Sequence, residues 1–484
     1  MPRISPHISP HIDIGDLCLP ESDATLQARL FHAIRDKIVH GLWPLTGKLP
    51  STRKLALELN LSRNTVIATY EQLLCEGYIE SQRGSGFYVS LELPEHYLNP
   101  NNTAETPASH RELKQDINRS FAPGIPDLAQ FPLKKWQRYL QRHSSRTHIL
   151  GNSDLQGVLE LRSALSSYLA SSRSVVCRPE QIIITSGAQQ GLAIAALAIL
   201  QRDEKILLEQ PGYVQADKVM SLVDAQKCYV NVSPFKGVNI EQIITSEAKA
   251  LYITPSNQYP MGTTINSEQR LKLIDWASQR KRWIIEDDYD SEFQFAHRPH
   301  TSLQGLAAQI GLDNCVIYIG SFSKVMFNGL RLGYMVVPDS LVEQCLVMKD
   351  ALSGDSPVHT QYALADFIAE GELLRHIRKM RRLYKAKHQA MLSAITLYFG
   401  HHVEVISQAA GLHITFRWQG KIDEETLRQR ALNINLILRT LSYYQPHAKS
   451  GRDWHGVVLG FGNTPLEQIP VLVEQLANEF FKNN

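Results

Sequence analysis

The chain of 484 residues is too long for one ordinary hydrophobic core, so two or three folding units are expected. Hydrophobic residues make up 43% and charged residues 20%, which excludes a mostly disordered, collagen-like or coiled-coil chain. The net charge of +2 gives no global sign of nucleic acid binding, although a small DNA-binding domain can lie within a large neutral chain.

Residues 1–90 form the first predicted domain, in which helices precede a short hairpin. Apolar residues recur every four positions from Leu26 to Ile38, as on one face of a helix. Ser51 and Ser62 are typical N-caps, so a short helix is predicted after each. Two short helices joined by a tight turn form a helix-turn-helix. The glycine-rich segment 84–86 permits a tight hairpin tip, which we interpret as a wing.

The second of these short helices begins with Arg63, Asn64 and Thr65, and the N-terminus of a recognition helix enters the major groove first. Arginine can contact guanine edges or phosphate, and asparagine suits adenine. Residues 48–65 include four basic residues and one acidic residue, a net charge of +3, so the basic patch is local. The alternative is a helical adaptor domain whose arginines are merely solvated.

A linker is predicted over residues 91–118, which are rich in Pro, Asn, Thr and charged residues and lack apolar periodicity. The third segment, residues 119–484, alternates helical patterns with short apolar runs at 182–185, 205–209, 250–254, 283–286 and 316–320. Strands alternating with helices predict a mostly parallel sheet that is covered on both faces. Ligands bind to such sheets at the loops beyond the carboxyl ends of the strands.

Two of these loops carry residues suited to an anionic or carbonyl ligand. Gly187 and Ala188 follow the run at 182–185 and begin a helix, a place suited to phosphate, although an ordinary structural turn is the alternative. Lys324 follows the run at 316–320, where a desolvated lysine can form a Schiff base with a carbonyl. Arg331 could clamp an anion together with the serines before the lysine. A surface lysine is the alternative.

An acidic run, Glu286, Asp287 and Asp288, ends another predicted strand. Clustering three acids is electrostatically costly unless one of them meets a cation such as a protonated pyridine nitrogen. The alternative is a solvated acidic loop.

Motifs along the whole chain carry a resemblance to a known family. The N-terminal segment resembles the GntR-type winged helix-turn-helix in LPSTRKLA, LSRNTV, EGYI and RGSGFYV. Residues 120–484 resemble fold-type I aminotransferases, and most of all the aminotransferase-like domain of MocR-type regulators, in SGAQQ, EQPGY, PSNQYPMG, EDDYDSEF and SFSKVMFNGLRLGY. The resemblance implies an α/β fold: a winged helix-turn-helix joined by a linker to a fold-type I aminotransferase-like domain with a mostly parallel sheet.

The resemblance also implies a role for each matching residue. Lys324, the catalytic residue, would hold pyridoxal 5′-phosphate as the internal aldimine, and Asp287 would keep the pyridine nitrogen protonated. Tyr289 would hydrogen-bond the phenolic oxygen of the ring, on which Tyr213 would stack. The phosphate would be held by Gly187, Ala188, Ser321, Ser323 and Arg331. DNA would be contacted by Arg53, Arg63, Asn64, Thr65 and Gly84.

The sequence departs from the family pattern at several positions. Val458 stands where aminotransferases commonly place the arginine that binds the substrate carboxylate, so an ordinary α-amino acid loses its expected partner. Arg417 and Arg452 are the candidates to replace that arginine. The other departures are Asn152 for tyrosine, Gln215 for an effector-binding arginine, Asn257 for histidine and Asn328 for proline.

The leading hypothesis is a transcription regulator that binds double-stranded operator DNA as a homodimer. Its C-terminal domain would sense a small amine, an amino acid or the cofactor, which would act through differential affinity for two states. The alternative is a catalytically active aminotransferase with an accessory winged helix, which the missing arginine disfavours. A DNA-binding protein with a dead ligand domain is disfavoured because Lys324, Asp287 and Tyr289 are retained.

The remaining expectations concern location and metals. No stretch of about 18 uncharged apolar residues occurs and the N-terminus lacks a secretory pattern, so we expect a cytoplasmic protein without a membrane partner. The six cysteines include no C-x-x-C pair, which argues against a zinc site, and no metal is expected.

Overall fold

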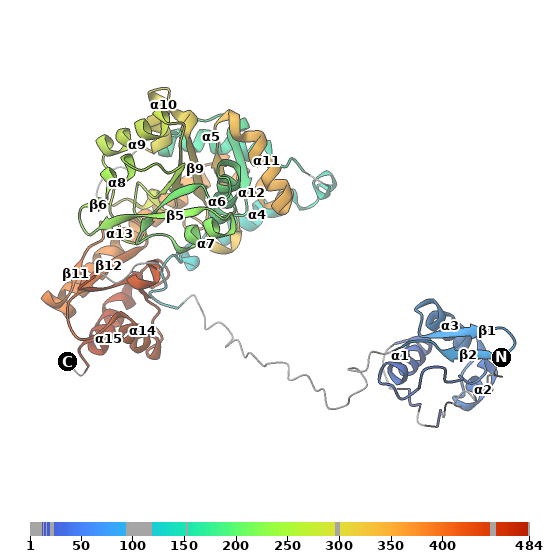
Figure 1. The fold of residues 1–484 in the computed structure, drawn as a ribbon. Coiled ribbons are helices and arrows are strands. Elements are labelled where there is room, and N and C mark those ends of the chain that lie inside the picture. The colour runs from blue at the N-terminus through green and yellow to red at the C-terminus, as the bar shows by residue number, and fades with distance from the viewer. Residues whose placement is uncertain are drawn as a thin grey trace, which may run out of the picture. The chain divides into compact units, whose positions relative to one another are not determined.

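The structure is a computed structural model that describes residues 12, 14–15, 17–19, 24–92, 119–151, 153–295, 301–445 and 452–482. The chain divides into two compact units, residues 1–114 and 115–484 (Figure 1). The predicted linker, residues 91–118, lies outside the described residues except for its first two positions. Within the described ranges, no helix is long and apolar enough to cross a membrane.

The N-terminal unit consists of three helices followed by a two-stranded hairpin. Its elements are α1 (Leu26–Val39), α2 (Thr52–Glu58), α3 (Arg63–Cys75), β1 (Ile79–Gln82) and β2 (Gly86–Val89). Ser51 and Ser62 accept hydrogen bonds from backbone amides three residues later, so both predicted caps are present. The predicted apolar face of α1 is buried from Leu30 to Ile38, but Leu26 is 48% exposed because it lies at the first position of the helix, at the edge of the core.

The predicted hairpin is present and has a three-residue tip. β1 and β2 pair antiparallel from Ile79 opposite Val89 to Gln82 opposite Gly86, so residues 83–85 connect them. Gly84 has a φ of +78°, in the left-handed region that other residues avoid. The sharp turn therefore depends on glycine at this position.

The C-terminal unit is built on an eight-stranded sheet of order β3-β10-β9-β8-β7-β4-β5-β6. Its strands are β3 (Ile182–Thr185), β4 (Lys205–Gln210), β5 (Gln226–Ser233), β6 (Gly237–Val238), β7 (Ala250–Ile253), β8 (Trp283–Asp288), β9 (Val316–Ser321) and β10 (Gly333–Val336). Neighbours from β9 to β5 are parallel, whereas β10 runs antiparallel to β3 and β9, and β6 runs antiparallel to β5. The mostly parallel sheet is confirmed, and all five predicted apolar runs are strands.

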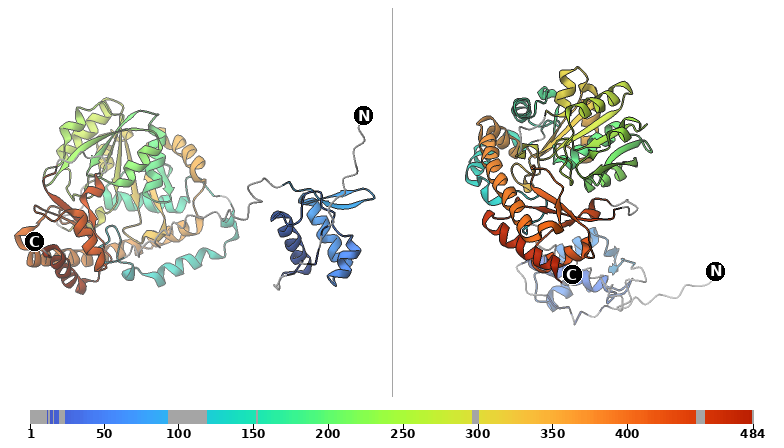
Figure 2. Two further views of the ribbon diagram at one scale, coloured as in Figure 1. Left: turned by 60° about the horizontal axis from the view of Figure 1, so that its bottom comes forward. Right: turned by 90° about the vertical axis from the view of Figure 1, so that its left-hand side faces the viewer.

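Helices cover both faces of this sheet (Figure 2). Alternate residues of a strand point to opposite faces, so Ile285 packs on one side and Ile284 on the other. The side of Ile285 is covered by α6 (Ala188–Ile199), α7 (Val214–Leu222) and α11 (Asp339–Ser353). The other side is covered by α8 (Ile240–Ile244), α9 (Ser267–Gln279), α10 (Leu303–Gln309) and, beside β3, α5 (Leu159–Arg173).

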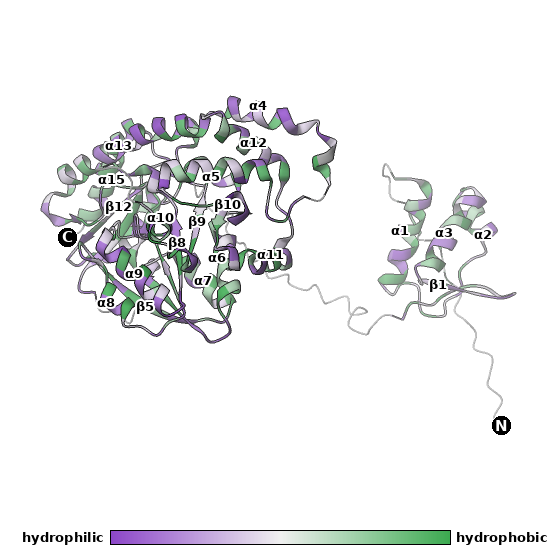
Figure 3. Cartoon of the chain, turned by 90° about the horizontal axis from the view of Figure 1, so that it is seen from above, coloured by the Kyte–Doolittle hydropathy of each residue, from purple (hydrophilic) through white to green (hydrophobic). Residues whose placement is uncertain are grey.

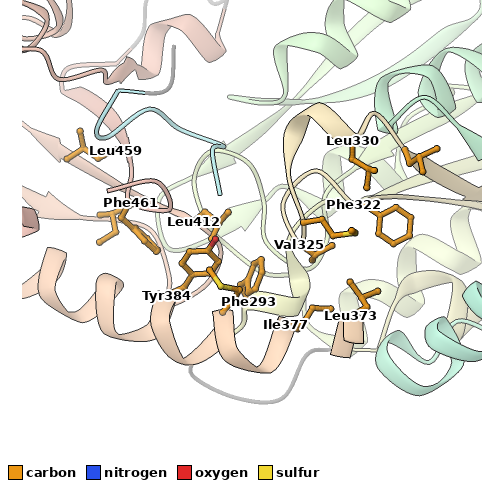
Figure 4. Packing of buried hydrophobic residues seen from close by; sticks show 14 of the residues in the cluster. Phe293, Phe322, Val325, Leu330, Leu373, Ile377, Tyr384, Leu412, Leu459 and Phe461 are labelled. Carbon is orange, nitrogen blue, oxygen red and sulfur yellow. The ribbon is translucent and has the colours of Figure 1, made fainter. Parts of the chain in front are cut away.

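A second, smaller sheet was not predicted. Its order is β11-β12-β14-β13, and all neighbours are antiparallel: β11 (Glu404–Val405), β12 (His413–Trp418), β13 (Arg439–Thr440) and β14 (His455–Gly460). One face of it, which includes Phe416 and Leu459, packs against α13 (Glu372–Phe399) and α15 (Ile469–Phe481). The same buried cluster continues to the segment around Phe322 and Val325 (Figure 4).

The remaining helices are α4 (Leu133–Ser144), α12 (Val358–Ala369) and α14 (Glu424–Asn433). Outer helices such as α4 and α13 carry hydrophilic residues on one side and hydrophobic residues on the other (Figure 3). The apolar side of each is therefore available to cover the core.

Candidate functional site

A cavity of about 290 Å³ lies at the carboxyl ends of several strands of the large sheet. Nine of its lining residues are those that the sequence predicted to hold the cofactor: Gly187, Ala188, Tyr213, Asp287, Tyr289, Ser321, Ser323, Lys324 and Arg331. They lie at the ends of β8 and β9 or in the segments that follow β3, β4, β8 and β9, and the sheet order brings these strand ends together. Their individual roles toward a ligand remain proposals.

The three acids at the end of β8 do not form a cluster, because alternate residues point to opposite faces of the sheet. Glu286 accepts hydrogen bonds from the amides of Leu303 and Gln304 at the start of α10, at 2.8 and 2.9 Å. Asp288 forms an ion pair with Arg173 at 2.5 Å. Only Asp287 lines the cavity, and all three are buried, which excludes a solvated loop.

The two carboxylate oxygens of Asp287 have different surroundings. The hydroxyl of Tyr252, on β7, donates to Oδ2 at 2.7 Å. Oδ1 is buried and has no hydrogen-bond partner among the residues that the structure describes. Burial raises the pKa of Asp287 to about 6, while the Tyr252 hydroxyl opposes the rise. The free oxygen is therefore a buried acceptor that faces a ligand-sized space.

Lys324 lies in the same cavity with a half-buried side chain. Its Nζ donates to the backbone carbonyl of Gly124, which comes from the start of the C-terminal unit. Burial lowers the pKa of Lys324, although the charges of Asp290 and Asp287 oppose this. A lower pKa increases the fraction of neutral amine, which is the nucleophilic form.

The other end of the cavity is suited to an anion. Gly187 precedes the first residue of α6, so free backbone amides point out of the helix there. The Ser321 and Ser323 hydroxyls are 3.0 Å apart. Arg331 is exposed and forms no ion pair within the described residues. A side chain at Gly187 would lie 3.7 Å from the Arg331 guanidinium, so glycine leaves that space open.

Tyrosines form one wall of the cavity. Tyr213 meets the ring of Tyr259 edge-on at 6.3 Å, and the hydroxyls of Tyr259 and Tyr444 share a hydrogen bond at 2.8 Å. The hydroxyl of Tyr289 donates to the backbone carbonyl of Asn257 at 2.9 Å. A planar ligand ring between Tyr213 and the end of β8 would lie near the aromatic ring of Tyr213 and the phenol of Tyr289.

In the N-terminal unit, the residues predicted to contact DNA lie mostly on the surface. Arg53, Arg63, Asn64 and Gly84 are exposed. Neither arginine has an ion-pair partner in the part of the unit that the structure describes, so both charges are available. Thr65 is half-buried, and its hydroxyl is 2.8 Å from that of the cap residue Ser62, so it also helps to begin the helix.

Comparisons with known proteins match both units. Residues 26–89 match the bacterial regulatory proteins of the gntR family, and residues 120–445 match aminotransferase class I and II. The probable rhizopine catabolism regulatory protein MocR of Rhizobium meliloti is 32% identical over 91% of each chain. The HTH-type pyridoxine biosynthesis transcriptional regulator PdxR of Corynebacterium glutamicum is 30% identical over 92% of this chain and 93% of its own.

This chain belongs to the MocR-type regulators of the gntR family. Its C-terminal unit also resembles a solved structure, the α-aminoadipate aminotransferase LysN of Thermus thermophilus complexed with N-(5′-phosphopyridoxyl)-L-leucine. The identity is 26%, the TM-score is 0.69, and the match covers 76% of this chain and 93% of that one. The predicted cofactor, pyridoxal 5′-phosphate, is the cofactor of the class I and II aminotransferases.

The departures from the MocR-type pattern have distinct surroundings. Val458 is fully buried, and Arg417 and Arg452 form ion pairs elsewhere, with Glu404 at 2.6 Å and with Glu424 at 2.9 Å. Neither arginine lines the cavity, so neither replaces the missing one there. Gln215 accepts a hydrogen bond from Gln189, and Asn328 donates to the Gly124 carbonyl. Asn152 lies outside the described residues.

Sequence reasoning missed a buried polar pair beside Lys324. Asn257 donates to Asp290 at 2.9 Å, and its own side-chain oxygen has no partner within the described ranges. Burial raises the pKa of Asp290 to about 8. Asp290 lines the cavity and lies in the quoted motif EDDYDSEF, two residues beyond the end of β8, so the motif itself was the available signal. Tyr252, Tyr259 and the 123–124 segment also line the cavity and were not predicted.

Proposed function

We propose that this MocR-type chain is a DNA-binding transcription regulator whose C-terminal unit holds pyridoxal 5′-phosphate through Lys324. The ligand that changes its hold on DNA is a small amine, an amino acid or the cofactor itself. The observation that supports this most directly is the cavity, which Asp287, Lys324 and Arg331 all line. Among the described residues, one buried oxygen of Asp287 has no hydrogen-bond partner and Arg331 has no ion-pair partner.

The residues of the cavity fit the cofactor at each end. The unpartnered Oδ1 of Asp287 is an acceptor that a pyridinium N–H would satisfy, and buried polar atoms rarely stay without a partner. The N-terminus of α6, two serine hydroxyls and Arg331 supply the donors and the charge that a phosphate needs. The absence of a side chain at Gly187 leaves room beside the guanidinium.

When bound, the cofactor supplies an electrophilic carbonyl carbon and an electron-poor ring. Lys324 would hold it through its amine, whose pKa is lowered by burial. Asp287 would keep the ring nitrogen protonated, and the carbonyl of Gly124, which now accepts a hydrogen bond from Nζ, would help to position the lysine. With an amine ligand bound in its place, Lys324 would lie near Asp290 and could accept a proton.

Regulation requires only that the ligand bind one of two states of the protein better than the other. The exposed Arg63 and Asn64 at the start of α3 would read the base edges, and the wing tip at Gly84 would lie against the backbone. The N-terminal unit therefore binds DNA and the C-terminal unit binds the ligand.

The test measures both units in one protein. An operator is first selected from a DNA library with the full-length, cofactor-loaded chain. Amines are then screened for a change of the visible cofactor absorbance, and each positive amine is added to a DNA-binding titration followed by fluorescence anisotropy. We expect such an amine to change the DNA affinity of the wild type and not that of Lys324→Ala. If neither a positive amine nor removal of the cofactor changes the DNA affinity, the proposal is wrong.

A working aminotransferase with an accessory winged helix is the second candidate. It is favoured because Lys324, Asp287 and Tyr289 all line the cavity, as they would in an active enzyme. It is disfavoured because Val458 places no charge in that cavity. Incubation of amino donors with a keto acid, followed by chromatography of the amino acids formed, separates the two: sustained turnover supports the enzyme.

A further inference from the structure

Two helices on the surface of the C-terminal unit, α4 and α13, are rich in basic residues. α4 has four lysines and arginines and no acidic residue, and α13 has seven and one. With histidine neutral, the two helices carry a net charge of +10 in a chain whose net charge is +2. Both lie along one edge of the unit, where Lys135 on α4 forms an ion pair with Glu372 on α13 at 2.8 Å (Figure 3). The positive charge is therefore concentrated in one region of the surface.

Part of this charge is used in ion pairs within the unit. Arg142 and Arg375 pair with acidic residues of α12, α13 and the turn between them at 2.6–2.9 Å. Lys387 is buried and pairs with Asp127 at 2.7 Å. Six basic residues of the two helices remain exposed and form no ion pair in the ranges that the structure describes. We call them the basic face: Lys134, Arg138, Arg378, Lys379, Arg382 and Lys385.

The members of the basic face on α13 are spaced for a common partner. Arg378, Arg382 and Lys385 are four and three residues apart, so their side chains lie on the same side of the helix. Lys379 is three residues before Arg382 and adjoins this row. From Arg378 to Lys385 the helix rises about 10 Å, which matches the axial rise of about three phosphates on one strand of duplex DNA.

The composition of the basic face fits a phosphate backbone better than a protein or a membrane. Tight protein interfaces are centred on apolar and aromatic anchors, and helices that lie on membranes insert an apolar side. The apolar sides of α4 and α13, which include Trp136 and Met380, are buried in the core, apart from Leu133 at the first position of α4. Exposed lysines and arginines bind phosphates without reading the base sequence.

The chain itself keeps a DNA duplex within reach of the basic face. The described residues 92 and 119 are joined by 26 residues, which can span at most about 90 Å. A duplex held by the N-terminal unit therefore cannot move far from the C-terminal unit. Contacts that are too weak to hold DNA alone add affinity when the two partners are already connected in this way.

We propose that the basic face binds the phosphate backbone of the DNA that flanks the operator. The inference rests on the proposed function, because the N-terminal unit must first hold the operator. The flanking contacts add affinity without changing which bases are read. Each phosphate contact releases condensed counterions, so these contacts should steepen the dependence of affinity on salt.

The test compares two duplexes that carry the same operator. One is the selected operator, trimmed to the base pairs whose substitution weakens binding. The other adds about 30 base pairs of arbitrary sequence on each side, a length of about 100 Å at 3.4 Å per base pair. The dissociation constants of the full-length, cofactor-loaded chain are measured by fluorescence anisotropy at several salt concentrations.

Two triple variants lose the same amount of charge from different places. The face variant combines Arg378→Gln, Lys379→Gln and Arg382→Gln. The control variant removes three exposed lysines that lie on other elements of the C-terminal unit and also have no ion pair within the described residues: Lys218→Gln, Lys236→Gln and Lys421→Gln. All six side chains are exposed, so neither variant loses a buried contact. The cofactor absorbance and the affinity for the trimmed operator report that each variant is folded.

For the wild type we expect the flanked duplex to bind about tenfold more tightly than the trimmed one at low salt, with a slope of log affinity against log salt that is steeper by about 2.7 for three phosphate contacts. The face variant should lose most of the gain and of the extra slope, and the control variant should keep both. Equal affinity of the wild type for the two duplexes, a gain that survives in the face variant, or an equal loss in both variants overturns the inference and leaves operator binding intact.

Two further outcomes separate this inference from its alternatives. A wild type that shows no flank gain but binds vesicles containing phosphatidylserine, with that binding lost in the face variant, assigns the basic face to a membrane and overturns the inference. A wild type from which no operator can be selected overturns the proposed DNA binding itself.

Discussion

Asp287→Asn is the most informative single change in the cavity, because it keeps the shape of the side chain and removes its charge. The amide oxygen can still accept the hydrogen bond from Tyr252, which Oδ2 now accepts at 2.7 Å. The other atom of the side chain, at the place of the unpartnered Oδ1, becomes a donor. It can no longer accept a hydrogen bond from a protonated ring nitrogen.

The effect on folding follows from the pKa of Asp287, which burial raises from 3.8 to about 6. A carboxyl with a raised folded pKa binds more protons in the folded state than in the unfolded state between pH 4 and pH 6. Its contribution to stability is therefore lost as the pH rises through that window. The shift corresponds to at most about 3 kcal/mol, of which about 1.4 kcal/mol is lost between pH 5 and pH 8. An asparagine side chain does not titrate, so Asp287→Asn lacks this pH-dependent loss of stability.

Whereas Asp287→Asn removes a loss of stability, it should weaken the binding of the cofactor. A charge-assisted hydrogen bond in a buried site contributes about 1.5–3 kcal/mol, so the variant should bind the cofactor about 10- to 100-fold more weakly. In the wild type, affinity should fall as the pH drops through about 6, because protonation of Asp287 removes the anion that pairs with the ring nitrogen. The variant should lack this acid limb.

Two measurements check these expectations. Absorbance titration gives the cofactor affinity, and urea unfolding of the cofactor-free chain at pH 5 and pH 8, followed by tryptophan fluorescence, gives the stability. Tyr252→Phe is the matched variant: it removes the hydroxyl that stabilises ionised Asp287, so it should raise the pKa of that carboxyl and move the acid limb to higher pH. The reasoning fails if Asp287→Asn binds the cofactor as tightly as the wild type and shows the same change of stability with pH.

Three further predictions concern other parts of the chain. Lys324→Ala should fold but lose covalent attachment, and borohydride reduction with peptide mapping of the wild type should find the cofactor on Lys324 and on no other lysine. Arg63→Ala should weaken operator binding. If Arg63 contacts guanine, the loss should be about 1–3 kcal/mol and specific to one base position; if it contacts phosphate, the loss should be uniform across sequences and the salt dependence flatter. The control Arg35→Ala, which removes an exposed ion pair with Asp36, should not weaken operator binding. Residues 119–484 should form a homodimer in light scattering, and a monomeric fragment that still binds the cofactor would contradict this.

Features that depend on local sequence were predictable. The caps Ser51 and Ser62 act on amides three residues away, and the strands of the large sheet are short apolar runs that stand out in the sequence. The small sheet was not predicted, because β11 and β13 are two residues long and carry no apolar run. They become strands only through pairing with segments that are distant in sequence.

The cavity was predictable where a motif carries its residues. Each of the nine predicted residues lies in or beside a short motif that follows a strand, and all nine line one cavity. The acidic run was interpreted as a cluster, although strand alternation alone places Glu286 and Asp288 opposite Asp287. Tyr252 could not be assigned to the cavity from sequence, because its contact with Asp287 depends on β7 lying beside β8.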